Sequence, residues 1–168
     1  MNSIRRIACV SLFAAFFLGA CAGPSSPDGG LLVELDRTMR AATPGMAVSL
    51  RLSSEQVRTG GAIGASVGAN SGGYVYLFQL GTDGRSLGLV FPNAMDGANY
   101  VAAGTQLTLP RPNWRMSARG PAGVGHLLAV LTPAPLDLLA LQQGVAAGDI
   151  KVAGPYGAAM ATVREVAP

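Results

Sequence analysis

The sequence has few of the residues from which catalytic and metal sites are usually built. It contains two cysteines and a single histidine, His126, and charged residues make up 12% of the chain. A hydrolytic triad needs a nucleophile, a base and an orienting acid, and His126 is the only imidazole base on offer. It falls inside an expected strand, so we interpret it as a packed or edge histidine. Zinc is not expected either, because single acids scattered along the chain give no metal-ligand spacing. We predict a protein that is not an enzyme and that holds no metal or cofactor.

The sequence also lacks the features of a disulfide-stapled or nucleic-acid-binding protein. Cys9 lies in an apolar run and Cys21 stands three residues after that run ends, which leaves no second cysteine for a disulfide in the rest of the chain. The net charge of +3 includes Arg5 and Arg6 near the start, and the remaining arginines are scattered singly. Nucleic-acid binding requires a basic patch or stripe, so we expect no nucleic-acid partner.

The first twenty residues have the order of a secretory signal. Met1 to Arg6 is short and positive, Ile7 to Leu18 is apolar, and two small residues follow. The apolar run is shorter than the roughly 20 residues that a bilayer-spanning helix needs. We therefore predict a signal peptide over residues 1–20 that is cleaved after export; an uncleaved membrane anchor is the alternative.

The end of this segment, Leu18-Gly19-Ala20-Cys21, resembles the lipobox of bacterial lipoproteins. The resemblance implies that Cys21 receives a diacylglycerol, that cleavage precedes it, and that its new amine takes a further fatty acid such as palmitate. Two or three acyl chains hold a protein durably at a membrane. Ala22 after the cysteine resembles the pattern of lipoproteins sent to the outer membrane. The expected location is the cell envelope, at the periplasmic face of the outer membrane, with the inner membrane and the outer face left open.

Residues 21–30 read as a lipidated, flexible tether, because they are small, polar and rich in Pro and Gly. Nine such residues reach about 30 Å when fully extended. Residues 31–168 are expected to form a single domain, since 148 residues remain after cleavage and one core suffices for that length. The 23 glycines and 11 prolines favour short strands over long helices.

Apolar periodicity predicts the elements of this domain. Tyr74 to Leu80 is the clearest strand and is apolar on both faces, so we expect it to be central and covered on both sides. Helical spacing predicts a helix from Leu31 to Ala42, capped by Asp28, although a strand is also possible there. A second helix is expected from Leu136 to Gln143, ended by Gly144. The other predicted strands are Met46 to Ser53, Ile63 to Ala69, Leu87 to Phe91, Asn99 to Val101, Gln106 to Leu109, Trp114 to Ala118, His126 to Thr132, and a final edge strand at Met160 to Val166.

Seven to nine short strands without strand–helix–strand alternation indicate a mainly β domain. We predict an antiparallel β-sandwich, immunoglobulin-like or an open barrel, with one or two short helices.

Several motifs in order resemble an uncharacterised bacterial family, domain of unknown function 4384. They are Gly73-Tyr74-Val75-Tyr76-Leu77, Asp83-Gly84, Phe91-Pro92-Asn93, Asn99, Gly104 and Gly120-Pro121-Ala122-Gly123. The resemblance covers Val48 to Pro135. It implies an extracytoplasmic, sandwich-like module, found in some proteins beside kinase, caspase-like or cell-envelope modules, and no established activity.

A set of aromatic and polar residues gives the candidate binding surface. Core packing is the preferred explanation, because aromatic residues on strands mostly fill the interior of a sandwich. Alternatively, the loops Asp96 to Ala98 and Arg111 to Trp114 present some of them to a protein partner, since Trp, Tyr and Arg often anchor interfaces. The set consists of Tyr74, Tyr76, Phe91, Asn93, Tyr100 and Trp114.

Three functions are compatible with these features. The first is a non-catalytic protein-binding or envelope-assembly module that is lipid-anchored at Cys21, with an envelope protein as its partner. The second is a module that binds peptidoglycan or another glycan through exposed aromatics. The third is a hydrolase that uses carboxylates alone, which requires two acids to face each other in a cleft.

Overall fold

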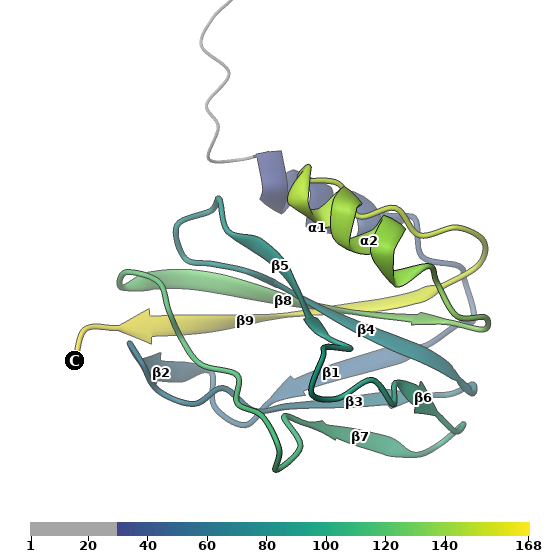
Figure 1. The fold of residues 1–168 in the computed structure, drawn as a ribbon, viewed down its shortest axis with the longest axis horizontal. Helices are drawn as coiled ribbons and strands as arrows, with labels where there is room; N and C mark the ends of the chain where they lie inside the picture. The colour runs from purple at the N-terminus through teal and green to yellow at the C-terminus, as the bar shows by residue number, and fades with distance from the viewer. Residues whose placement is uncertain (1–29) are drawn as a thin grey trace, which may run out of the picture.

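The computed structural model describes residues 30–168, which form two β-sheets and two helices (Figure 1). The predicted signal peptide, Cys21 and the Asp28 cap lie outside these residues. In chain order the elements are α1 (Gly30–Arg40), β1 (Val48–Leu52), β2 (Gln56–Arg58), β3 (Ala65–Ala69), β4 (Gly73–Leu80), β5 (Leu87–Phe91), β6 (Tyr100–Val101), β7 (Gln106–Leu109), β8 (Gly123–Thr132), α2 (Leu138–Ala146) and β9 (Gly157–Val166).

The sheets have unequal width. Sheet A has three strands in the order β1-β3-β7, and sheet B has six, ordered β2-β9-β8-β4-β5 with β6 also paired to β4. All neighbours are antiparallel except β2 and β9, which are parallel. The two sheets pack face to face around a shared core, and within residues 30–168 neither sheet closes into a barrel. The prediction of a mainly β sandwich with two short helices is confirmed.

Strand β4 is central and buried on both faces, as its sequence predicted. Its neighbours in sheet B are β8 and β5. Val75 and Leu77 point into the core between the sheets, and Tyr76, Phe78 and Leu80 point to the opposite face, where the helices lie. Because side chains alternate along a strand, a strand that is apolar at successive positions requires a covering layer on each side.

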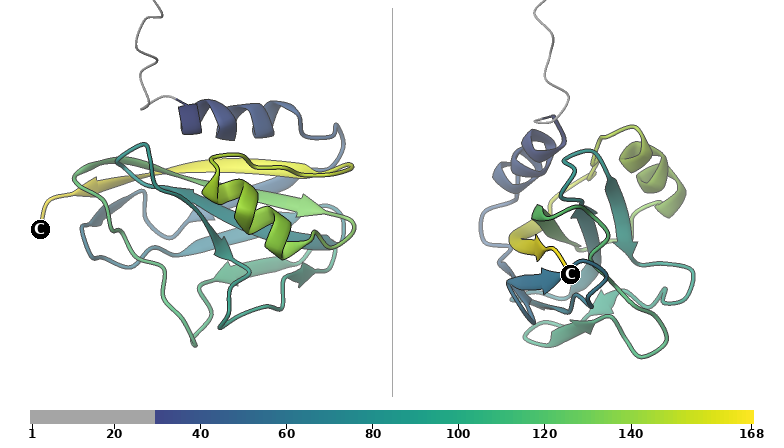
Figure 2. Two further views of the ribbon diagram at one scale, coloured as in Figure 1. Left: turned by 45° about the horizontal axis from the view of Figure 1, so that its top comes forward. Right: turned by 90° about the vertical axis from the view of Figure 1, so that its left-hand side faces the viewer.

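The two helices provide the covering layer on the outer face of sheet B (Figure 2). Leu35 of α1 and Leu141 and Val145 of α2 are buried there against β4 and β8. The side chain of Asp137 caps α2 by accepting hydrogen bonds from the N–H groups of Leu139 and Ala140, at 2.9 and 3.1 Å. Within residues 30–168, neither helix is long and apolar enough to span a bilayer.

Three expectations about individual elements were wrong. Residues 114–118 do not form a strand, and they make a single bridge, between Ala62 and Ser117. Here the chain crosses the open side of the sandwich, which is the side where β5 has no strand of sheet A opposite it. β9 is not an edge strand, because the short, unpredicted β2 pairs with it on its outer side. α2 continues through Gly144 to Ala146, and the glycine with positive φ that follows the helix is Gly148 (φ 77°).

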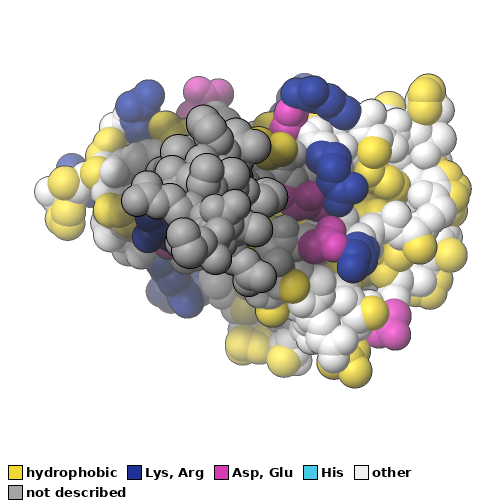
Figure 3. Space-filling model, turned by 90° about the horizontal axis from the view of Figure 1, so that it is seen from above, with side chains coloured by type: hydrophobic (Ala, Val, Ile, Leu, Met, Phe, Trp, Pro, Cys, Tyr) yellow, Lys and Arg dark blue, Asp and Glu magenta, His cyan; other side chains and the backbone are white. Residues whose placement is uncertain are grey.

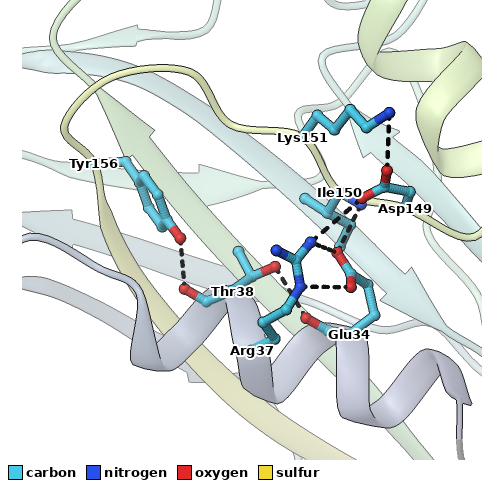
Figure 4. Close-up of polar contacts among 7 residues, drawn as sticks. All are labelled: Glu34, Arg37, Thr38, Asp149, Ile150, Lys151 and Tyr156. Atoms are coloured by element: carbon cyan, nitrogen blue, oxygen red, sulfur yellow. Dashed lines mark hydrogen bonds and ion pairs between the residues drawn. The ribbon is translucent and has the colours of Figure 1, made fainter.

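Helix α1 is bound to the segment before β9 through the partly buried carboxylate of Glu34 (Figure 4). Glu34, whose side chain is 13% exposed, accepts hydrogen bonds from Nε and Nη2 of Arg37 at 2.9 and 2.6 Å and from the N–H of Ile150 at 3.0 Å. Asp149 bonds both Arg37 (3.3 Å) and Lys151 (3.1 Å). The hydrogen bond from Arg37 is the main reason that the pKa of Glu34 lies below its usual 4.5.

The outer surface of this layer is charged but balanced. Arg37 and Lys151 are paired with Glu34 and Asp149, and a second pair on α1 joins Arg40 to Asp36. Figure 3 shows this face with basic and acidic side chains side by side. The positive and negative charges of these paired groups on the helix layer therefore cancel.

Replacing Glu34 with Gln should lower the free energy of unfolding by about 1–2 kcal/mol at pH 7, because charge-assisted bonds to Arg37 and Ile150 are weakened. Since the pKa of Glu34 is lowered on folding, its stabilisation is present above pH 4.5 and is lost as the pH falls through its folded-state pKa. Urea denaturation of both proteins at pH 7 and pH 3 measures this, and the difference should shrink at pH 3.

Asp36→Asn on the same helix is the matched control, because it breaks an exposed pair with Arg40 and should change stability little. Equal losses in both variants, or a Glu34→Gln effect that is the same at both pH values, would contradict this role for Glu34.

Candidate functional site

Two loops at the open side of the sandwich are joined through Asp96. The carboxylate of Asp96 binds the guanidinium of Arg111 and accepts a hydrogen bond from Nε1 of Trp114 at 3.0 Å. Arg111 also donates to the carbonyl of Ala98 at 2.9 Å, and the Asn113 amide donates to the carbonyl of Met95. Asp96 is only 7% exposed, and the bonds to these partners offset the cost of burying its polar side chain.

Phe91, at the end of β5, lies beneath these loops. The ring of Trp114 stacks parallel to it, with centroids 6.3 Å apart and planes inclined by 4°. The guanidinium carbon of Arg111 is 5.7 Å from the Phe91 centroid. Trp114 is thus held by a ring contact and a hydrogen bond at once, which fixes its orientation before anything binds.

Trp114 borders a groove of about 570 Å³ that is open to solvent. One wall is β5 and the other is the segment 114–120 that leads into β8. The groove exists because sheet A, with three strands, is narrower than sheet B, so the inner face of β5 has no strand opposite it. Its apolar lining is Leu87, Val90, Met95, Trp114 and Met116.

Four charged residues line the same groove, and they differ in the hydrogen bonds and ion pairs that the protein provides for them. Asp83 accepts hydrogen bonds from its own turn, from Arg85 N–H and from Ser86, and the Ser86 hydroxyl contributes most to lowering its pKa to about 2. Glu165, 2% exposed, accepts from the Gly120 N–H at 3.0 Å. Arg115 and Arg119 are exposed, and neither has an ion pair within residues 30–168.

The six residues of the candidate binding surface separate into three places. Asn93 and Trp114 line the groove, and Phe91 lies buried behind Trp114. Tyr76 is buried under the helices, where its hydroxyl accepts a hydrogen bond from the Leu136 N–H at 2.7 Å. For Tyr76 and Phe91 the core-packing interpretation is therefore confirmed.

Tyr74 and Tyr100 form a pair away from the groove. Their ring centroids are 5.3 Å apart with planes at 70°, and Tyr100 is 59% exposed. Tyr74 lies at the start of β4 and Tyr100 opposite it on β6, whereas the groove contacts β4 near its end at Gln79, about 17 Å from Tyr74 at the rise of an extended strand. The six residues do not make one surface.

Val90, Met95, Arg115 and Arg119 also line the groove, and the sequence pattern did not predict this. Residues 114–118 were assigned to a strand, and nothing in the spacing of Arg115 and Arg119 indicated a shared groove. The two loops proposed as partner-binding, around Asp96 and around Arg111 to Trp114, do meet at this site.

His126 is half-buried in β8, as expected, and its burial lowers its pKa. Its Nδ1 is buried without a hydrogen-bond partner among the described residues, so no acid orients the imidazole as a triad would require. Within residues 30–168, no three potential ligands gather to hold a metal ion.

Asp96→Asn should loosen Trp114 and lower the free energy of unfolding by about 1–3 kcal/mol, because Arg111 loses its buried counter-charge. Trp114 is the only tryptophan of the chain, so its fluorescence reports on this site alone. We expect a red-shifted emission and stronger acrylamide quenching. Asp137→Asn, at the cap of α2, is the control and should leave emission unchanged. Unaltered emission and quenching in Asp96→Asn would show that Asp96 does not position the ring.

Comparison with known families supports the resemblance seen in the sequence. The family described as Domain of unknown function (DUF4384) matches residues 56–135, which begins eight residues later than the segment expected from the motifs and ends at the same residue. No curated protein matches the chain. The matched segment runs from β2 through β8 and includes the Asp96 loops, β5 and most of the groove lining. Residues 56–135 therefore carry a domain that resembles the Domain of unknown function (DUF4384) family.

Proposed function

We propose that the chain is a lipid-anchored envelope lipoprotein whose sandwich is a non-catalytic binding module, and that its partner docks at the groove beside β5. The observation that carries the binding role is the groove itself. It combines an unopposed strand face, an apolar lining and a tryptophan held in place by Asp96 and Phe91. Protein interfaces are enriched in Trp, Met and Arg, and each of these lines the groove.

The charged groups of the groove favour binding over hydrolysis. Carboxylate-only hydrolysis needs one acid that donates a proton and a second that attacks or activates water. Both oxygens of Asp83 are engaged by its own turn, and its low pKa keeps it ionised. Asp83 therefore stabilises its own turn and does not serve as a proton donor.

The anchoring part of the proposal rests on Leu18-Gly19-Ala20-Cys21 and the signal-like segment before it. A tether of nine residues would keep the domain close to the membrane surface, so its partner is an envelope protein within short reach.

Cys21→Ser should prevent lipid attachment and cleavage before residue 21. We expect the variant to accumulate at the larger, precursor size and to incorporate no labelled palmitate, because serine supplies no thiol for the thioether. Gel mobility, labelling and membrane fractionation measure this. Cys9→Ser, inside the apolar run, is the control and should mature normally. A Cys21→Ser protein of mature size that stays labelled and membrane-bound would refute the anchoring proposal.

Photo-crosslinking tests the groove in the intact, anchored protein. Met95 is 63% exposed at the groove, and Leu139 is 65% exposed on α2, so p-benzoylphenylalanine at each position samples two equally accessible apolar sites. We expect a discrete protein adduct from position 95 and none from position 139. Equal adduct patterns from both positions would remove the groove as the docking surface.

Peptidoglycan binding is the second candidate, because a partly exposed Trp114 beside Asn93 also offers a stacking ring and an amide to a sugar. Co-sedimentation of the full chain with purified peptidoglycan that is lost in Trp114→Ala would favour a glycan over a protein partner.

A further inference from the structure

We propose that the groove accepts an extended acidic segment of a partner protein, which adds to β5 as a further strand and places its carboxylates on Arg115 and Arg119. The inference rests on the proposed function and names the class of partner. It follows from three features of the groove: a free strand edge, a floor that accepts apolar side chains, and two unpaired cations.

β5 ends sheet B, and within residues 30–168 no strand pairs with its outer edge. In an antiparallel ladder, hydrogen-bonded pairs alternate with pairs whose backbone groups point outward. Gly81 N–H bonds Ser86 O at 2.8 Å, so Gly88, opposite Gln79, belongs to the bonded set, and Leu87 and Leu89 turn their backbone groups to the open side. This edge can therefore accept another strand.

The composition of β5 is unusual for an exposed edge. Natural proteins protect such edges with charged residues, prolines or bulges, because an unpaired apolar strand invites association. Leu87-Gly88-Leu89-Val90-Phe91 contains no charged residue. A register shift opposite Leu77 and Phe78 and the following Pro92 limit the pairing length, and the stretch from Leu87 to Leu89 remains open. A short added strand fits this edge better than a long one.

The groove floor suits alternate apolar side chains of such a strand. Val90 and Met116 lie on the inter-sheet side, and Met95 and Trp114 form the outer rim. Methionine adapts to side chains of different shape, whereas Trp114 is already fixed by Asp96. Preorganisation of the ring lowers the entropic cost of binding.

The unpaired arginines select the charge of the partner. Elsewhere on the domain, Arg37, Arg40 and Arg111 are bound to acids of the chain itself. Arg115 and Arg119 are exposed on the wall opposite β5, and the two acids of the groove are already bonded within the protein. A guanidinium pairs with a carboxylate through two parallel hydrogen bonds, so acidic side chains on the added strand satisfy both arginines.

Other occupants meet only part of these requirements. An anionic glycan or lipid headgroup would bind the arginines but would leave the strand edge unpaired. A second copy of this chain could pair β5 with β5, but that strand has no acid to offer the arginines. These occupants are outcomes that the following experiment distinguishes.

The test measures binding of defined peptides to the purified full chain by fluorescence anisotropy. The probe is a fluorescein-labelled peptide of about eight residues with alternating Val and Glu. One comparison peptide carries Lys in place of Glu, and the other carries N-methyl groups on alternate backbone amides, which block strand addition. We expect the Val/Glu peptide to bind with Kd below about 1 mM, and both comparison peptides to bind at least about tenfold more weakly.

Charge reversal provides the matched variants. Arg115→Glu/Arg119→Glu should weaken the Val/Glu peptide by at least about tenfold and should gain binding of the Lys peptide, a reversal that unfolding cannot produce. The control is Arg51→Glu/Arg164→Glu, at two exposed arginines that also have no ion pair among the described residues, and it should bind as the parent does.

Each alternative result overturns the inference. Equal binding of the N-methylated peptide indicates an anion site without strand addition, and equal binding of the Lys peptide removes the role of the arginines. If no peptide binds below about 1 mM, the partner is not an acidic strand. The same conclusion follows if the chain self-associates with concentration and Arg115→Glu/Arg119→Glu does not change that association. If the crosslink from position 95 persists in these cases, the groove remains the docking surface for a different partner; if it is absent as well, the proposed function fails too.

Discussion

The architecture depends on one constraint, that β4 is apolar on both faces and must be covered on both. Val75 and Leu77 need the second sheet, and Tyr76, Phe78 and Leu80 need the helices. A fully buried aliphatic or aromatic side chain contributes about 1.5–3 kcal/mol relative to an exposed one, so neither layer is dispensable. Three layers result: a narrow sheet, a wide sheet and a pair of helices.

The groove is a consequence of how the two sheets meet. Three strands cannot cover the full width of sheet B, and the uncovered part is the inner face of β5. Loops that cross this gap close the core at Phe91 and leave the space outside it open. Asp96 then organises the rim, because one buried carboxylate binds both Arg111 and Trp114. The groove and its rim are therefore formed by the two sheets and these loops, without an additional helix or strand.

The helix layer and the groove use charge differently. On α1, arginines are paired with acids of the chain, and these pairs fasten the helix to the segment before β9. In the groove, the acids are bonded within the protein, whereas Arg115 and Arg119 have no ion pair among residues 30–168. We propose recognition at the groove rather than at the helices, because these two arginines lie next to the unpaired edge of β5.

Elements with a local residue pattern could be predicted from the sequence. Period-two alternation identified β1 and β3, an apolar run on both faces identified β4, and Pro92 marked the end of β5, because side-chain direction in a strand depends only on position along it. The two-faced burial of β4 could be stated in advance for the same reason. The ordered motifs from Gly73 to Gly123 also indicated the family that residues 56–135 resemble.

Which strands lie at the sheet edges, and where a site forms, depend on long-range contacts. β9 lost its expected edge position to the three-residue β2, whose sequence carries too little pattern to predict a strand. Of six candidate residues, Asn93 and Trp114 reached the groove, while Tyr76 and Phe91 went to the core and Tyr74 paired with Tyr100. Arg115 and Arg119 became groove residues because segment 114–120 crosses the open side. Such placements depend on pairing between residues far apart in the chain, and local periodicity carries no information about them.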